Sequence, residues 1–443
     1  MKKLISIIAV ALAVTVWCVM PAMAAKIDVG GELRARGIYN TNFDSEKDNT
    51  KHWLDGRFRL DAKIQQGMTT GVLQIDALGN SNSDLTGTGN NGNLIFGNGT
   101  GASYNLVGVR QAYLVVNFPV LTVIGGRYEV KLGNGLVLND TTDIVAVNAP
   151  IGPVNLLVGY LVLGNANSPL GRVSSQGGHG LNGDALAVNA GVKDIGGSGI
   201  NGDIFGVFAH RVLPTLLPDE TPVPDTKDNT LQAYGITGDA KIGPVNAGAE
   251  VDIFGGDVTK PVDATGAVKF KGTNILVTGA LPAGSVGLPV GFNAAFISAT
   301  GQDGNSTDVN INAIDGDFRA GNILVRNDFN NYEGVESIGF ASGQNLGLTA
   351  VKVAANLPNI KFGGSTHSPE IGLVWAQTAK DNPVNNKKDI GTEIYANTNC
   401  VFDPNLSGNI GLGYLAAGHA LDPSATQKAE NQVKVEASLT FHF

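Results

Sequence analysis

Hydrophobic and polar residues alternate without interruption over the last twelve positions of the chain, from Gln432 to Phe443. Successive side chains of a β-strand point to opposite faces, so this segment predicts a strand with one apolar and one polar face. The apolar face ends with two aromatic residues, Phe441 and Phe443. Such a strand needs other protein or lipid against its hydrophobic side.

The same alternation predicts further strands along the chain, with many charges on their polar faces. Strand-like segments cover residues 27–39, 57–65, 73–77, 245–253 and 393–402. Tight turns are predicted at residues 66–69, 119, 150–153, 243–244 and 403–405. Long polar or glycine-rich connections cover residues 40–56, 79–104, 164–183, 214–229, 256–272 and 418–430. Short turns that alternate with long loops are typical of transmembrane β-barrels.

The first 24 residues predict a secretory signal peptide. A basic start (Lys2 and Lys3) precedes an apolar run that ends at Met20, and small residues lead to an expected cleavage site after Ala24. A membrane anchor is the alternative, because the run is about as long as the shortest spanning helices. The small-residue site favours cleavage, which leaves residues 25–443 as a single domain.

No other segment reaches about eighteen consecutive apolar residues, which excludes a further spanning helix. Because only helices and closed barrels pair every backbone polar group in lipid, the pattern predicts an all-β transmembrane antiparallel β-barrel. Short turns are expected on the periplasmic side and long loops outside. Residues 300–344 form either one long loop or a loop with two strands, so the predicted strand number is 16 or 18. A secreted soluble β-sandwich or β-helix is the alternative, since its strands alternate similarly.

Composition excludes several other classes of protein. Without the signal peptide, 28 Lys and Arg residues face 39 Asp and Glu residues, a formal charge of −11 that argues against a nucleic-acid partner. Cys400 is the only cysteine after residue 24, so an internal disulfide is excluded. Covalent haem would need a C-x-x-C-H motif, which the sequence lacks, and no cofactor is expected.

The polar faces of the predicted strands supply candidate pore-lining residues. Arg34 and Arg36 of one strand are predicted to lie beside Arg57 and Arg59 of the next. Rings of charged side chains set pore selectivity, and a basic wall opposite an acidic wall would orient dipolar solutes. The alternative is that lumen charges only pair across strands. The full candidate set comprises Arg34, Arg36, Arg57, Arg59, Lys63, Arg127, Lys131, Glu32, Asp61, Glu129, Asp239, Glu250 and Asp252.

No catalytic or metal site is predicted. A hydrolase would need a Ser–His pair with an orienting group, yet most histidines lie in loop-like sequence. These histidines are His52, His179, His210, His367, His419 and His442. No H-x-x-x-H motif or acidic cluster has metal spacing. The acidic run Asp44, Glu46 and Asp48 lacks the later Gly and Glu of a calcium loop, and the glycine-rich residues 87–101 lack the Lys of a phosphate-binding loop.

The terminal strand ending in Phe443 resembles the C-terminal signature of bacterial outer-membrane barrels, in which Phe441 and Phe443 would belong to the barrel-closing strand. Two internal motifs, Arg110–Leu114 and Gly125–Gly133, are similar to the "Q-A-Y" and "G-R-Q-E" strands of the alginate-export family of outer-membrane porins. Segments 31–36, 391–393 and 411–414 are also similar. The resemblance implies an 18-stranded barrel and passive solute movement. Tyr128 stands where the family pattern has Gln, so the general porin function is carried over, not alginate itself.

These patterns predict an outer-membrane porin of a Gram-negative bacterium that passes small hydrophilic solutes and has no enzymatic activity. Expected partners are outer-membrane lipid, the barrel-assembly machinery and small solutes, and a homotrimer is left open. The alternative from another class is a sleeve that houses a periplasmic partner, such as a multihaem cytochrome, in an electron conduit. An adhesin is a weaker alternative. A plugged active transporter is disfavoured, because the first strand begins just after the cleavage site.

Overall fold

The computed structural model describes residues 25–42, 47–48, 50–84, 107–162, 184–210, 230–258, 268–301, 309–310, 320–324, 346–382, 385–422, 424 and 426–443. The predicted signal peptide lies outside these residues. So do the predicted loops 164–183 and 214–229, the glycine-rich residues 87–101, and Asp44 and Glu46 of the acidic run. Among the described residues, no helix is long and apolar enough to cross a membrane.

Alternating side chains produce extended strands throughout the described chain. The strands are β1 (Lys26–Thr41), β2 (Lys51–Gln66), β3 (Thr69–Asp84), β4 (Val107–Asn117), β5 (Thr122–Leu132), β6 (Leu138–Ile151), β7 (Val154–Val162), β8 (Asp184–Val192), β9 (Ile200–His210), β10 (Thr230–Ile242), β11 (Val245–Val258), β12 (Val268–Leu281), β13 (Gly291–Ala299), β14 (Val309–Asn310), β15 (Leu348–Asn356), β16 (Ile360–Phe362), β17 (Ser365–Gln377), β18 (Asp389–Asp403), β19 (Leu406–Ala417) and β20 (Gln432–His442). Two short 3₁₀ turns, η3 (Ile195–Gly197) and η4 (His419–Leu421), lie in the connections.

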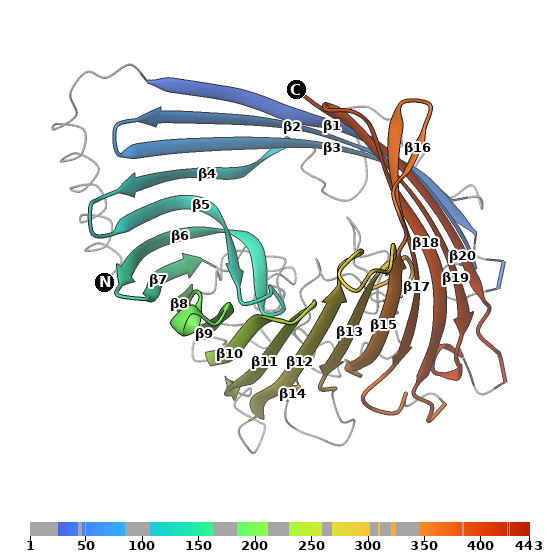
Figure 1. Cartoon of the computed structure of the whole chain (residues 1–443). Coiled ribbons are helices and arrows are strands. Elements are labelled where there is room, and N and C mark those ends of the chain that lie inside the picture. The colour runs from blue at the N-terminus through green and yellow to red at the C-terminus, as the bar shows by residue number, and fades with distance from the viewer. Residues whose placement is uncertain are drawn as a thin grey trace.

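Eighteen of these strands form a closed antiparallel barrel, the larger of the two strand numbers predicted. Each pairs with its neighbour in chain order, and β20 returns to pair with β1. Figure 1 shows β1–β3 on one side of the ring and β10–β12 on the opposite side. The two other strands are short additions: β14 pairs in parallel with β12, and β16 forms a hairpin with the start of β17.

Backbone hydrogen bonds and an aromatic stack join the two ends of the chain. The Gly31 N–H donates to the Phe443 carbonyl at 3.0 Å, and the Phe443 N–H donates to the Gly31 carbonyl at 3.2 Å. The Phe443 ring lies directly over Gly31, where an added Cβ would come within 2.5 Å of it. The same ring stacks on Phe58 and Phe441, with centroids 6.1 and 6.3 Å away. The first and last strands are therefore joined by these terminal hydrogen bonds and aromatic contacts in addition to the hydrogen bonds of their β-ladder.

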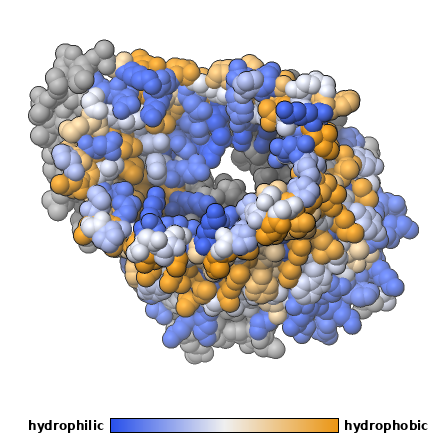
Figure 2. All heavy atoms as spheres, in the orientation of Figure 1, coloured by the Kyte–Doolittle hydropathy of each residue, from blue (hydrophilic) through white to orange (hydrophobic). Residues whose placement is uncertain are grey.

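The two faces of each strand have opposite polarity, as the alternation predicts. On β1, Ile27, Val29 and Leu33 point outward and are exposed, whereas Glu32 and Arg34 on the other face are partly buried. Figure 2 shows hydrophobic residues over the outer surface of the barrel and hydrophilic residues around its central opening. A soluble β-sandwich has the opposite distribution, with its apolar side chains inside and its polar side chains outside, so that alternative is wrong.

The structure also corrects the predicted boundaries of several loops. β1 continues to Thr41 and β2 begins at Lys51, so the connection predicted over residues 40–56 is shorter. β3 likewise continues to Asp84, into the predicted loop 79–104. These strand ends are rich in polar residues, so they lack the apolar pattern that identifies a strand. Within residues 300–344, the described positions contribute only β14, which pairs with β12 and adds no strand to the ring.

The contact of Phe443 with Gly31 gives a test of barrel closure. In Gly31→Val the added side chain meets both the Phe443 ring and the backbone carbonyl oxygen of Arg59, and we expect the folded barrel to unfold at a lower temperature. A cost of about 1–3 kcal/mol is typical of such overpacking. The temperature at which the heat-modifiable band shifts in gel electrophoresis measures this change. Gly279→Val is the matched control, because an added Cβ there meets no atom within 4 Å; equal shifts in both variants would contradict the stacking role.

Candidate functional site

The wall formed by β1, β2 and β3 carries arginines that are paired with carboxylates. Arg57 donates to Glu32 on the neighbouring strand, with its Nε 2.9 Å from Oε1. Arg59 makes two bonds to Asp76 of β3, at 2.6 and 2.8 Å. The side chains of Arg57 and Arg59 are 18% and 14% exposed, so both still reach the barrel interior. These arginines therefore pair with carboxylates across strands, which is the alternative that the sequence left open, and they also remain accessible from the lumen.

The other predicted residues of this wall differ in burial. Arg36 is only 4% exposed and lies 3.8 Å from Glu436 of β20, which also lies 3.6 Å from Lys434. Arg34 is directly opposite Arg57 in the ladder. Because like charges in opposite positions repel, the carboxylate on Glu32 stabilises this arrangement. The remaining two candidates lie on β2: Asp61 accepts a bond from Gln74 at 2.6 Å, and Lys63 is exposed.

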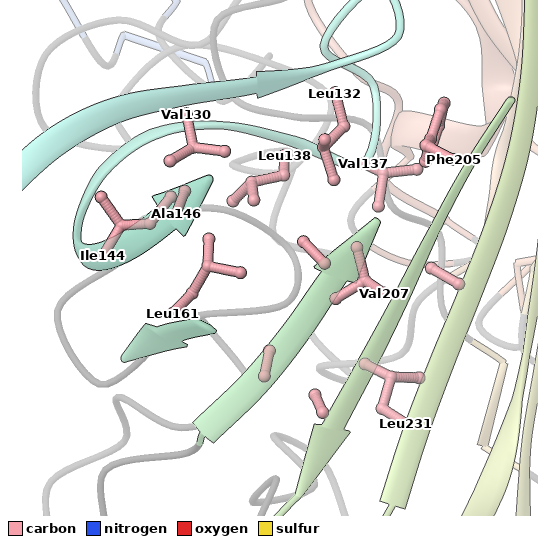
Figure 3. Packing of buried hydrophobic residues seen from close by; sticks show 14 of the residues in the cluster. Val130, Leu132, Val137, Leu138, Ile144, Ala146, Leu161, Phe205, Val207 and Leu231 are labelled. Carbon is pink, nitrogen blue, oxygen red and sulfur yellow. The ribbon is translucent and has the colours of Figure 1, made fainter. Parts of the chain in front are cut away.

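The hairpin of β5 and β6 folds into the barrel. Its residues Val130, Leu132 and Leu138 pack in one interior cluster with Phe205 and Val207 of β9, as Figure 3 shows. A strand that lay flat in the ring wall could not bring these residues to β9, which is four strands away along the ring. The hairpin therefore narrows the space within the barrel.

The tip of this hairpin, residues 133–137, is held by Glu250 of β11. The backbone N–H of Asn134 donates to Glu250 Oε2 at 2.5 Å. Gly133 is required here, because its φ is +57° and an added Cβ would lie 2.7 Å from Phe205 and 2.8 Å from Glu250 Oε2. A buried carboxylate that accepts backbone N–H bonds is a strong anchor, since charged hydrogen bonds contribute roughly 1.5–3 kcal/mol.

A second inward segment, residues 320–324, is held in the same way by Glu393 of β18. The N–H groups of Asn322 and Leu324 each donate to the carboxylate at 2.7 Å, and that of Ile323 donates at 3.0 Å. The Asn322 side chain also donates to the carbonyl of Leu412 on β19 at 2.8 Å. Glu393 has no exposed area.

Both inward segments meet in a second interior cluster. Leu136 from the hairpin tip and Leu324 from the other segment are each 1% exposed and pack in it. Its other members come from β12 to β19 and include Leu276, Ile297, Leu348, Val374 and Leu415. The two clusters occupy interior space on the side of β5–β19, and the polar opening borders the charged wall of β1–β3. Figure 2 shows such an opening, surrounded by hydrophilic residues.

The predicted acidic wall is largely covered by the hairpin tip. β10 and β11 lie nine places from β1 and β2 in the ring of eighteen, so the two walls are opposite each other. Glu250 and Asp252 face inward, but neither has any exposed area. Asp239 is exposed and accepts a bond from Asn201 at 2.7 Å. The expectation of an open acidic wall at Glu250 and Asp252 therefore needs correction: Glu250 holds the constriction instead of lining it.

The charged residues of β5 lie on the hairpin face opposite the apolar cluster. Glu129 and Lys131 alternate with Val130 and Leu132 and are exposed. Glu129 accepts bonds from Arg110 at 3.2 Å and Gln111 at 3.0 Å. Arg127 lies 3.6 Å from Asp143 of β6. These three predicted residues therefore belong to a hairpin inside the ring, and their contact with a solute stays a prediction.

Sequence reasoning missed a polar network on the inner wall of β13–β18. Tyr395 donates to Glu370 at 2.7 Å, Asn293 donates to the same carboxylate at 3.2 Å, and Lys352 lies 3.5 Å from it. The Lys352 ammonium also lies 5.4 Å from the centre of the Tyr395 ring. Each residue occupies a polar position of an alternating strand, but nothing local in the sequence indicates that they meet.

Among the described residues, no group of three His, Cys, Asp or Glu side chains could hold a metal ion.

No protein-family model and no curated protein matches the sequence. The fold is similar to several solved outer-membrane proteins. A BenF-like porin from Pseudomonas fluorescens Pf-5 has 13% identity and a TM-score of 0.54, covering 94% of this chain and 99% of its own. OccAB1 of Acinetobacter baumannii has 14% identity and a TM-score of 0.51, covering 95% and 96%. OccK2 (OpdF) of Pseudomonas aeruginosa has 11% identity and a TM-score of 0.52, covering 94% and 98%.

At these identities the likeness is one of fold. It supports the predicted porin-type barrel. It does not support the resemblance to the alginate-export family, because none of these three proteins is named as a member of that family.

The anchoring carboxylates predict how the constriction responds to mutation. Replacing Glu393→Ala removes the acceptor for three backbone N–H groups. Segment 320–324 should then detach from β18 in a fraction of the molecules. We expect larger and more variable single-channel conductance in planar bilayers, because loss of one such anchor changes the docked population by roughly tenfold or more. Asp403→Ala is the control, since its carboxylate accepts a bond from Asn405 within the turn between β18 and β19. Unchanged conductance in both variants would show that the segment does not limit the pore.

Proposed function

We propose that this chain is an outer-membrane porin of a Gram-negative bacterium, through which small hydrophilic solutes diffuse passively. The observation that carries this proposal is a closed barrel with an apolar exterior and a polar interior that two anchored segments narrow. Hydrogen bonds between neighbouring strands pair the backbone N–H and carbonyl groups of the barrel in lipid. The polar interior leaves a path for water. Solutes that fit between the inward segments and the β1–β4 wall would pass.

The interior gives no support to the sleeve for a cytochrome. Apolar side chains from β5 to β19 and from the two inward segments pack together in the barrel. A protein partner inside would have to displace both segments and break their bonds to Glu250 and Glu393. The structure favours a channel over a conduit for this reason.

The lumen charges support weak selectivity for ions. Arg57 and Arg59 are each paired with a carboxylate, and Lys352 is paired with Glu370. A paired charge exerts a smaller field on a passing solute than an isolated one. The two arginines still retain exposed surface, so their field biases permeation along the β1–β3 wall.

Purified barrel should form channels in planar bilayers and make liposomes permeable to small sugars, amino acids and organic acids. The swelling rate of the liposomes should fall with solute size, because the barrier is mainly steric. Heat-unfolded protein is the control for contaminating channels. A folded barrel without conductance, purified with haem absorbance, would contradict the porin and favour the sleeve. Alginate oligomers belong in the same solute panel, as a direct test of the motif resemblance.

Arg57 and Arg59 give the test of selectivity. The double replacement Arg57→Gln and Arg59→Gln removes two positive charges and the arginines that are bonded to Glu32 and Asp76, so permeation should shift toward cations. A change of about two- to fivefold in the ratio of cation to anion permeability is expected for charges screened by water. Reversal potentials in a salt gradient measure this ratio. The matched control is Lys193→Gln with Lys361→Gln, two exposed lysines in turn regions. An unchanged ratio would remove the arginines from the permeation path.

A further inference from the structure

Three reactive side chains lie together on the outer face of β17 and β18. Cys400 and His367 are direct partners in the ladder, and the Cys400 Sγ lies 3.1 Å from His367 Nδ1. The other ring nitrogen, Nε2, lies 2.8 Å from the Ser365 hydroxyl. Ser365 and His367 are two residues apart on one strand, so their side chains share a face. Sequence analysis rejected a hydrolase-like arrangement because no such set was apparent.

The direction of the hydrogen bonds identifies the thiol as the proton donor. The Ser365 hydroxyl donates to the Phe362 carbonyl at 2.6 Å, so it accepts from the Nε2–H of His367. A neutral imidazole with its hydrogen on Nε2 has a lone pair on Nδ1. That lone pair faces the Cys400 S–H. The chain of bonds therefore has the order of a nucleophile, a base and an orienting group.

Local structure explains why these residues meet. Gly363 and Gly364 form the turn between β16 and β17, with φ of +57° and +86°. This turn brings the Phe362 carbonyl opposite Ser365, whose hydroxyl it fixes. The hairpin of β16 and β17 thus sets the orientation of the imidazole before Cys400 of β18 is added.

The thiol faces the membrane. Cys400 alternates on the same face as Ile394 and Phe402, which are 57% and 44% exposed on the barrel exterior. It lies three residues before the turn between β18 and β19, a height of about 7 Å from the strand end for a tilted strand. Because barrel strands span the hydrocarbon core, the boundary with the headgroups, where lipid ester groups lie, is expected near the ends of the strands.

Cys400 is itself only 2% exposed, and it belongs to the lining of a groove in the outer surface. The groove has a volume of about 410 Å³ and crosses β1, β2, β18, β19 and β20. Its lining combines the large residues Leu54, Phe402, Ile410 and Leu439 with the small residues Ala35 and Gly408, which leave space between them. A groove lined by apolar groups on the face that contacts lipid fits a fatty acyl chain, which is apolar along its whole length.

We propose that Cys400 accepts a fatty acyl group from a membrane phospholipid, whose chain lies in this groove. The thiol passes its proton to His367 Nδ1 while the sulfur attacks the ester carbonyl carbon. The C–S bond forms, the C–O bond to glycerol breaks, and the lysophospholipid alkoxide takes the proton from His367. The products are an S-acyl thioester on Cys400 and a neutral lysophospholipid hydroxyl. Ser365 is a positioning residue, because it orients the imidazole through Nε2.

The experiment uses the full-length barrel in liposomes of phosphatidylethanolamine whose acyl chain ends in an alkyne. We expect a label on the folded wild-type protein that hydroxylamine removes, and a mass increase of one acyl group in intact-protein mass spectrometry. Cys400→Ala should carry no label. His367→Gln should form it about a hundredfold more slowly, the usual contribution of a general base. His419→Gln is the matched control, since this exposed histidine pairs with Asp422 in a distant connection.

Two results would overturn the proposal: a wild-type barrel that stays unlabelled although its thiol can be fully alkylated after unfolding, or a label that persists in Cys400→Ala. An equal labelling rate in His367→Gln would remove the base from the step. Heat-modifiable migration and unchanged conductance show that each variant is folded. Because the groove lies outside the barrel, the conductance readout also separates this proposal from the proposed porin function.

Discussion

The structure depends on the need to pair every backbone N–H and carbonyl group in a medium without water. An open sheet would leave two unpaired edges, and the cost of each unpaired group is several kcal/mol. The ladder between β1 and β20 removes both edges. The bonds between Gly31 and Phe443 continue this pairing beyond the ladder to the last residue of the chain.

The same requirement explains the interior. Residues 133–137 and 320–324 leave the wall, and the N–H groups that they turn away from any ladder need acceptors inside the barrel. Glu250 of β11 and Glu393 of β18 supply them. One carboxylate can accept several N–H bonds, whereas a neutral side chain satisfies fewer. The acidic residues of the inner wall thus have a structural role that their charge alone does not indicate.

The sequence predicts the fold well because strand alternation is local. The faces of β1, β2 and β11 follow directly from the side-chain period of two, and the short turns follow from Gly and Pro. The inward segments do not follow, because their contacts join residues about 70 to 116 positions apart. Glu393 and Glu250 look like ordinary lumen residues in an alternating pattern. The glycines at 133 and 135 were the available signal, since they surround Asn134 at a hairpin tip.

Glu393 belongs to a strand that is synthesised after the segment it holds. Residues 320–324 therefore have no acceptor until β18 joins the wall, and they cannot settle before then. The docked position of this segment is therefore tied to the integrity of the wall: any distortion that moved β18 away from its neighbours would also release residues 320–324.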